Sequence, residues 1–238
     1  ERLEFSDTLM QVGTGAFTGC SGLKELVIHQ KKGFKSCAKE ILGELWQKID
    51  VDFLYENGEA GGKRAHMVFP EHYDEAVENT PARILFTEYH GSGTNYRQCF
   101  YNKELNFAEY DSLFDMAVVM DKLEVLVDMS FGRLCHPWQL SKKAKKQYED
   151  YIRGNLKDIG EYLVESGSLN GLELLSRKKF WNREGLEHSI DVASGKKDME
   201  ISAFLMNERS RMLKEEQKVA GETENDGRPA RRRKKFQL

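Results

Sequence analysis

The segment His90-Gly91-Ser92-Gly93 contains the residues of this sequence with the clearest potential for catalysis. Loops of similar composition form the oxyanion hole of some esterases, and Ser92 would then act as the nucleophile, with Cys99 nearby. The sequence lacks, however, the GxSxG turn between a strand and a helix that such enzymes use. A glycine-rich turn between two strands explains the same residues with fewer assumptions. We therefore predict no catalytic residue and keep a hydrolase centred on this loop as the second alternative function.

An aromatic and basic cluster surrounds the same loop. If these side chains are exposed, they can stack on bases or hold a peptide, and if they are buried they belong to the core. The sequence leaves both interpretations open. The predicted binding residues are Arg83, Tyr89, His90, Tyr96, Arg97 and Tyr101.

The sequence predicts no metal site and no cofactor. Six histidines are present, but none forms an HExxH motif, and the spacing of His66 and His72 is poor for metal binding. Asp50 and Asp52 could bind a hard cation weakly, yet the EF-hand pattern is absent. A solvated acidic edge is therefore the favoured interpretation of this pair.

The charge of the chain is unevenly distributed. The net charge is −3, whereas residues 228–238 carry six basic side chains and no acidic one. A basic tail on an acidic body is commonly solvated. The alternative function is binding of nucleic acid or an anionic surface, with an affinity that falls steeply as salt is added. The basic residues of this tail are Arg228, Arg231, Arg232, Arg233, Lys234 and Lys235.

The cysteines and the hydropathy pattern bear on the compartment. Cys20, Cys37, Cys99 and Cys135 show no CxxC spacing, so we predict four free and mostly buried thiols, which favour the cytoplasm. The sequence begins at Glu1 without a leader, which we interpret as a processing boundary, and export is therefore left open. There is no run of eighteen apolar residues, so no membrane span is predicted.

Residues 1–30 are predicted to form short strands separated by tight turns. This stretch closely resembles the BspA-like leucine-rich repeat, and residues 1–9 look like the end of the preceding unit. One such repeat cannot bury its apolar face alone, so upstream repeats or the following domain must cover it. An ordinary three-stranded edge with glycine turns is the alternative. The positions that correspond to the family's unit are Val12, Ala16, Phe17, Cys20, Leu23, Leu26 and Ile28.

The middle of the chain mixes the two periodicities. Residues 34–48 have the spacing of an amphipathic helix, and the alternation at 49–53 predicts a short strand. The polar stretch 74–79 predicts one or two helical turns, whereas 84–89 has strand character. The segment 90–95 is expected to be a loop.

From Asn106 onward, apolar residues recur every three or four positions and predict helices to about residue 213. Pro137 should end one helix and Ser141 should cap the next. Segments 155–180 and 185–210 form a weak internal repeat whose period is close to that of ankyrin repeats. They resemble ankyrin-type helical hairpins but lack the T-P-L-H signature, so ordinary antiparallel helix pairs are a competing interpretation.

Together these features predict an α+β fold that is mostly α. Its parts are the end of a leucine-rich repeat β-solenoid (1–30), a mixed α/β segment (31–105), ankyrin-like helical hairpins (106–213) and a basic, disordered tail (214–238). The first resemblance implies a bacterial repeat protein that acts through protein–protein contacts. We therefore expect a non-enzymatic scaffold with a protein partner, and nucleic acid bound through the tail is the alternative.

Overall fold

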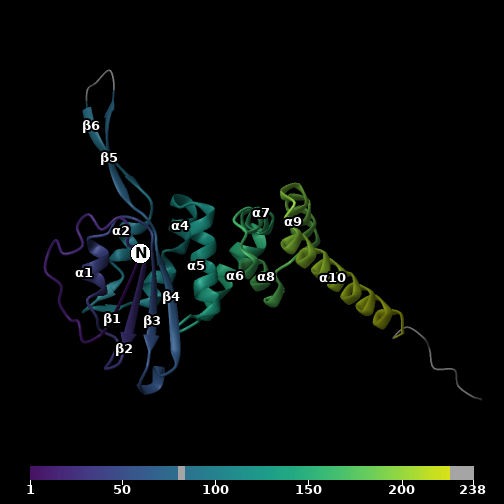
Figure 1. Ribbon diagram of the computed structural model, residues 1–238, viewed down its shortest axis with the longest axis horizontal. Coiled ribbons are helices and arrows are strands. Elements are labelled where there is room, and N and C mark those ends of the chain that lie inside the picture. Colours follow the sequence, from purple (N-terminus) through teal and green to yellow (C-terminus); the bar gives the residue numbers. More distant parts are fainter. Residues whose placement is uncertain (80–83, 226–238) are drawn as a thin grey trace, which may run out of the picture. The chain divides into compact units, whose positions relative to one another are not determined.

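The computed structural model describes residues 1–79 and 84–225 (Figure 1). The chain divides into two compact units, one from Glu1 to Ile152 and one from Arg153 onward. The fold is mixed α/β with helix predominating, as the sequence predicts. In the described part of the chain, no helix is long and apolar enough to cross a lipid bilayer.

A four-stranded sheet forms the centre of the first unit. It contains β1 (Arg2–Ser6), β2 (Glu25–Gln30), β3 (Ile49–Tyr55) and β4 (Lys63–Phe69), in that spatial order. The first three strands are parallel and β4 pairs antiparallel with β3. Because side chains alternate along a strand, the register gives the sheet one apolar and one polar face.

The apolar face of the sheet belongs to the core. Leu26 of β2 lies beside Val51 of β3, and Ile28 lies beside Phe53, all of them buried. The opposite face carries Asp50, Asp52 and Leu54 of β3, which are half-buried. Helix α5 (Leu123–Cys135) packs against β4, and α1 (Ala38–Gly43) contributes further buried residues.

The loop between β1 and β2 is held by a carboxylate from α1's C-terminal end. The side chain of Glu44 accepts the backbone N–H groups of Gly15 at 2.5 Å and Phe17 at 2.7 Å. Phe17 is only half-buried, whereas Leu23 is buried. The strands of residues 1–30 are therefore confirmed, and the membership of this stretch in a leucine-rich repeat stays a prediction.

The segment between the sheet and the helices differs from the sequence prediction. Residues 74–79 do not form helical turns, because β5 (Tyr73–Asn79) pairs antiparallel with β6 (Ile84–His90). Helix α1 is also shorter than the predicted helix at 34–48. The remaining elements are the 3-10 turn η1 (Gly58–Ala60), α2 (Gly93–Arg97), β7 (Phe100–Tyr101) and β8 (Glu104–Leu105).

The rest of the first unit is helical, as predicted. It comprises α3 (Phe107–Ser112), α4 (Phe114–Met120), α5 and α6 (Lys142–Gly154). Asn106 caps α3 by accepting the N–H of Glu109 at 3.2 Å, and the predicted cap Ser141 accepts the N–H of Ala144 at 3.1 Å. Both contacts satisfy backbone donors that have no partner within the helix.

Tyr110 of α3 is bonded to the edge of the sheet. Its hydroxyl accepts the backbone N–H of Val68 at 3.0 Å and donates to the carbonyl of the same residue at 2.6 Å. Both residues are buried. A side chain thus satisfies the backbone polar groups of β4 at this position.

The second unit consists of α7 (Leu156–Glu165), α8 (Leu169–Arg177), α9 (Arg183–Lys196) and α10 (Met199–Asn225). Helices α7 and α9 pack side by side, and the close approach requires Gly160, where an added Cβ would lie 2.1 Å from Ser189 Oγ. Helix α10 continues beyond residue 213, to Asn225. Two consecutive helix pairs are present, and their ankyrin-like character stays a prediction.

Candidate functional site

The predicted aromatic and basic cluster does not form one surface. Tyr89 and Tyr101 are 69% and 81% exposed, whereas Tyr96 and Arg97 are buried. The structure therefore corrects the prediction that Tyr96 and Arg97 bind a partner, because both belong to the core. His90 is half-buried. Arg83 and the six basic residues of the tail, Arg228, Arg231, Arg232, Arg233, Lys234 and Lys235, lie outside the described residues.

Arg97 has a structural role that uses all of its guanidinium nitrogens. Burial lowers its pKa to about 10. Its acceptors come from α1 and the loop after it, from the end of β4 and from its own helix, so the side chain joins three segments. These acceptors are the backbone carbonyl oxygens of Leu42, Leu45, Gln47, Pro70 and Gly93.

The glycines beside Ser92 are explained by packing. Gly91 has a φ of +75°, and an added Cβ would lie 2.2 Å from the carbonyl oxygen of Glu71. A Cβ on Gly93 would lie 2.2 Å from the carbonyl oxygen of Pro70. Side chains are therefore excluded at both positions, and the motif is accounted for without an oxyanion hole.

The loop offers little support for a hydrolase. The backbone N–H of Ser92 donates to Asp121 at 3.1 Å, and its buried hydroxyl donates to the same carboxylate. His90 instead stacks on Tyr73, with ring centroids 4.5 Å apart. Burial raises the pKa of Cys99 to about 12, which keeps the thiol protonated and unreactive at neutral pH.

A cavity of about 230 Å³ adjoins this loop. It is lined by His90 together with Glu71, Asp121 and Lys122. Arg97 and Cys99 are buried and do not line this cavity. The ion pair between Lys122 and Glu71, at 3.3 Å, spans part of its wall.

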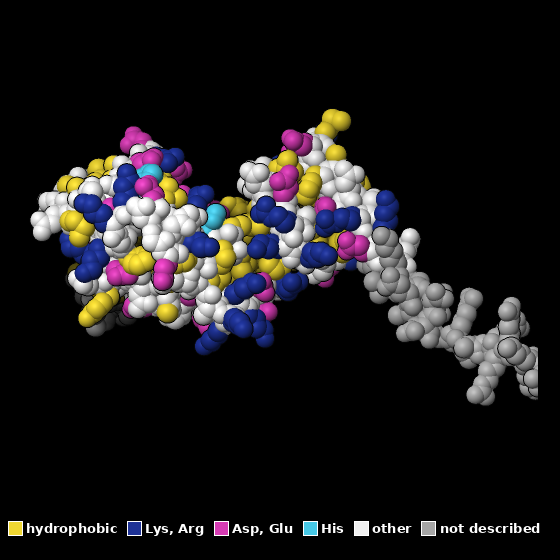
Figure 2. Space-filling view, turned by 90° about the horizontal axis from the view of Figure 1, so that it is seen from below, with side chains coloured by type: hydrophobic (Ala, Val, Ile, Leu, Met, Phe, Trp, Pro, Cys, Tyr) yellow, Lys and Arg dark blue, Asp and Glu magenta, His cyan; other side chains and the backbone are white. Residues whose placement is uncertain are grey.

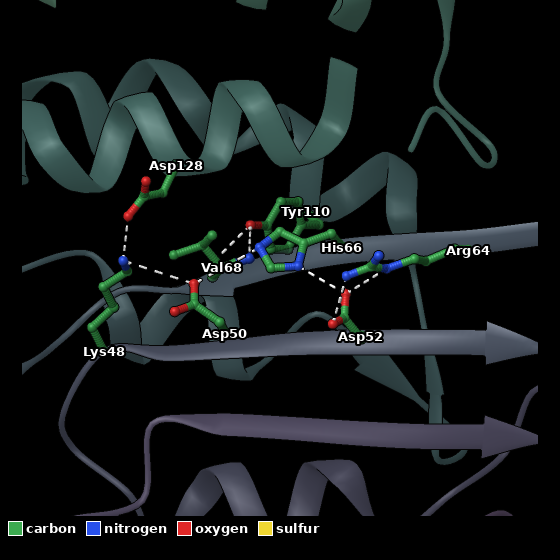
Figure 3. A network of polar contacts seen from close by, with 8 residues as sticks. All are labelled: Lys48, Asp50, Asp52, Arg64, His66, Val68, Tyr110 and Asp128. Carbon is green, nitrogen blue, oxygen red and sulfur yellow. Dashed lines mark hydrogen bonds and ion pairs between the residues drawn. The ribbon is translucent and has the colours of Figure 1, made fainter. Parts of the chain in front are cut away.

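The polar face of the sheet carries a network of charged side chains (Figure 3). His66 of β4 lies directly opposite Asp52 of β3, and its Nδ1 is 2.8 Å from the Asp52 carboxylate. Arg64 donates to the same carboxylate from two nitrogens, at 3.0 and 2.8 Å. Lys48 contacts Asp128, which reaches down from α5. We define these residues, with Asp50, as the sheet network.

The pKa values of the two aspartates of the sheet network are shifted in opposite directions. Partial burial raises the pKa of Asp50 above its ordinary value, and the charges of Lys48 and His66 oppose this only in part. Asp52 is also partly buried, but its hydrogen bonds to His66 and Arg64 outweigh the effect and hold its pKa below the ordinary value. The expectation of a solvated acidic edge is therefore wrong, since basic groups neutralise Asp52.

A second histidine is held in the same way on the same face of the sheet, in β2, where His29 lies beside Leu54 of β3. His29 of β2 lies with Nε2 2.7 Å from Glu4 and with Nδ1 2.6 Å from Glu56. The hydrogen bond to Glu4, followed by that to Glu56, raises the pKa of His29. Within the described residues, no group of three His, Cys, Asp or Glu side chains is arranged to hold a metal ion.

The first unit also contains a groove between α3 and α4 on one side and α6 on the other. Its volume is about 760 Å³ and its lining is mostly apolar. The apolar residues are Ala108, Phe114, Val118, Ala144 and Tyr151. Phe114 packs edge-on against Tyr151, with ring centroids 5.3 Å apart. We call this hollow the α6 groove.

The floor of the α6 groove rests on a buried ion pair. Arg133 donates to both oxygens of Asp111 at 2.8 Å, and the hydroxyl of Tyr148 donates to the same carboxylate at 3.0 Å. Arg133 and Tyr148 are fully buried. The hydrogen bonds fix the position of α3 relative to α5 and α6, so the groove is preformed.

Charged side chains border the α6 groove. Lys143 and Lys146 lie on its α6 wall, and Asp150 follows one turn later. On the opposite wall, Asp115 accepts a hydrogen bond from the amide of Gln147 at 2.6 Å. Figure 2 shows that Lys and Arg side chains gather in groups on the visible face rather than alternating evenly with acidic ones.

The α6 groove is not evident from the amino-acid sequence. The helical spacing of Phe114 and Tyr151 was sufficient to predict buried helix faces, but the faces leave an opening that spacing alone does not reveal. One signal was available. Lys142, Lys143, Lys145 and Lys146 occur in the first turns of a helix, where acidic residues are favoured by the helix dipole. Such a departure from local preference often marks a functional surface.

Comparison with known protein families, with curated proteins and with solved structures finds no match for this chain.

Proposed function

We propose that this chain is a non-enzymatic module that binds another protein, with the α6 groove as the binding surface. The observation that best supports this proposal is the groove itself, which is preformed, mostly apolar and bordered by charged side chains. Apolar, concave surfaces with a polar rim are characteristic of binding sites.

The proposal includes a repeat scaffold, as the sequence resemblances imply. It is supported by the parallel pairing of β1, β2 and β3, in which Arg2 lies beside Glu25 and Glu25 beside Asp50. The packing of α7 on α9 supports repeated helix pairs in the second unit. Each such unit needs neighbours to bury its apolar side, and this leaves extended surfaces for partners.

A photo-crosslinking experiment tests the proposal. The amino acid p-benzoylphenylalanine is placed at Val118, which lines the groove, or at the neighbouring Val119, which is 84% exposed and does not line it. We expect a defined protein to crosslink from position 118 and not from position 119. The two sites share residue type and helix, and position 119 is the more exposed of the two, so the control separates the groove from the general surface.

The captured protein is then purified and its affinity is measured by calorimetry. Val118→Asp should weaken binding by about tenfold or more, because a charge would be buried in the interface, whereas Val119→Asp should change it less than about twofold. Equal crosslinking from both positions, or equal effects of both substitutions, would rule out the groove as the binding surface.

A further inference from the structure

We infer that the α6 groove binds an acidic amphipathic helix of the partner protein, an inference that rests on the proposed function. The shape of the groove favours a helical ligand. Its walls are helices, and a groove between helices accommodates a further helix whose apolar residues recur every three or four positions. The groove-lining residues of α6 extend from Ser141 to Tyr151, which corresponds to a rise of about 15 Å, or roughly three helical turns.

The α6 wall presents a single stripe of side chains to this helix. Lys143 is followed after three and four residues by Lys146 and Gln147, and each of these is followed four residues later by Asp150 and Tyr151, respectively; all five line the groove. Such residues share one face of a helix. The stripe is therefore basic at the Ser141 end and aromatic at the Tyr151 end, where Phe114 and Val118 complete the apolar surface.

In the part of the chain that the structure describes, most lysines at the basic end of the stripe form no ion pair. Among the described residues, Lys142, Lys143 and Lys146 make no ion pair, and only Lys145 reaches a carboxylate, that of Glu149 at 3.7 Å. All four lysines are exposed. They repel one another at intervals of three and four residues, and the helix dipole adds to the positive potential. An incoming carboxylate relieves both effects.

Asp115 and Asp150 do not cancel this potential at the Ser141 end. Asp115 is already bonded to Gln147, and Asp150 lies beside Tyr151 at the far end of the stripe. The groove is therefore complementary to a helix with an apolar stripe about three turns long. Its glutamates or aspartates lie beside Lys143 and Lys146, and no acidic residue lies beside Asp150.

A display experiment with the full chain tests this inference. A yeast-display library of amphipathic 14-residue helices keeps apolar residues at positions a, d and e and varies each polar position among Glu, Gln and Lys. The library is selected against the wild-type chain, the variant Lys143→Glu/Lys146→Glu, and the matched control Lys142→Glu/Lys145→Glu. The control makes the same charge change on the same helix at positions that do not line the groove.

We expect the wild-type selection to enrich Glu at the polar positions of one end of the helix. A selected acidic peptide should bind the Lys143→Glu/Lys146→Glu variant at least about tenfold more weakly, by fluorescence anisotropy, and the control variant less than about threefold more weakly. Circular dichroism and thermal unfolding verify that both variants fold, as is expected of changes at exposed lysines.

Three results would overturn the inference. They are a selected pool without excess Glu, an equal loss of affinity in the control variant, and the absence of any helical binder. The crosslinking from Val118 reports separately on the proposed function. If a partner is captured there but its bound segment is not an acidic helix, the binding function stands and the present inference fails.

Discussion

The sheet network and the α6 groove are two charged regions of the same unit. They differ in whether their basic side chains are paired with carboxylates. In the sheet network, Arg64 and His66 share the carboxylate of Asp52. At the groove, Lys143 and Lys146 have no carboxylate partner among the described residues. The first region has the properties of a structural element, and the second has those expected of the proposed binding surface. Charge alone therefore does not identify a binding site, because the sheet network is also charged but its charges are paired within the protein.

The largest effect is expected beneath the groove. Asp111→Ala leaves Arg133 buried without its partner, and Tyr148 loses its acceptor, so the free energy of unfolding should fall by about 3–5 kcal/mol. Asp115→Ala, which removes an exposed carboxylate from the same groove, should cost less than about 1 kcal/mol. Urea unfolding of the two variants measures the difference. A similar cost for both would show that the groove is not supported by the ion pair.

A smaller effect is expected in the sheet network. Asp52→Asn weakens the hydrogen bonds to His66 and Arg64 and should cost about 1–2 kcal/mol at neutral pH, mostly through His66, because Arg64 is largely in water. Asp50→Asn should leave the stability within about 0.5 kcal/mol of wild type or raise it, because burial already disfavours the Asp50 charge. Chemical unfolding at pH 7 tests the pair. If both substitutions lower the free energy of unfolding equally, the two aspartates do not differ in their contribution to stability.

The same two variants should diverge in their pH dependence. The folded pKa of Asp52 is lowered, so its stabilising contribution is present above the unfolded value of 3.8 and is lost as the pH falls through the folded pKa. The stability deficit of Asp52→Asn should therefore shrink in acid. The folded pKa of Asp50 is raised, so the destabilising effect of its charge disappears as the pH falls to 3.8. Unfolding series between pH 7 and about pH 3 measure both trends.

The smallest effect concerns His29 of β2, on the same face of the sheet. Its folded pKa is raised above 6.5, so the stability from its charged form is complete below pH 6.5 and is lost as the pH rises through the folded pKa. NMR titration of the imidazole should place its midpoint above 6.5. Glu4→Gln/Glu56→Gln should lower that midpoint toward the ordinary value. An unchanged midpoint in the double variant would contradict the assigned cause.

The helical half of the first unit could be predicted because its information is local. Between Phe107 and Ile152, apolar residues recur every three or four positions, and this spacing predicts the helices. Ser141 is the capping residue of α6, and its type alone indicates where that helix begins. The hairpin of β5 and β6 could not be predicted in the same way. Residues 74–79 are short and polar, and they become a strand only because a partner strand is aligned beside them.

The same difference between local and long-range information applies to the site residues. Arg97 was taken for a binding residue because its sequence neighbours are aromatic, but its acceptors are carbonyls from segments about fifty residues away. Backbone acceptors leave no trace in a sequence. The groove likewise depends on how α3, α4 and α6 pack, and only the run of lysines at the start of α6 was visible beforehand.

The bond between Tyr110 and Val68 has a consequence for how the sheet can grow. The hydroxyl of Tyr110 occupies the position beside β4 where a fifth strand would form hydrogen bonds. It pairs with both the backbone N–H and the carbonyl of Val68. Lateral addition of another chain is thereby blocked on that margin. Among the described residues, no strand pairs with the outer side of β1, so the two margins of this sheet differ in whether their backbone groups are covered.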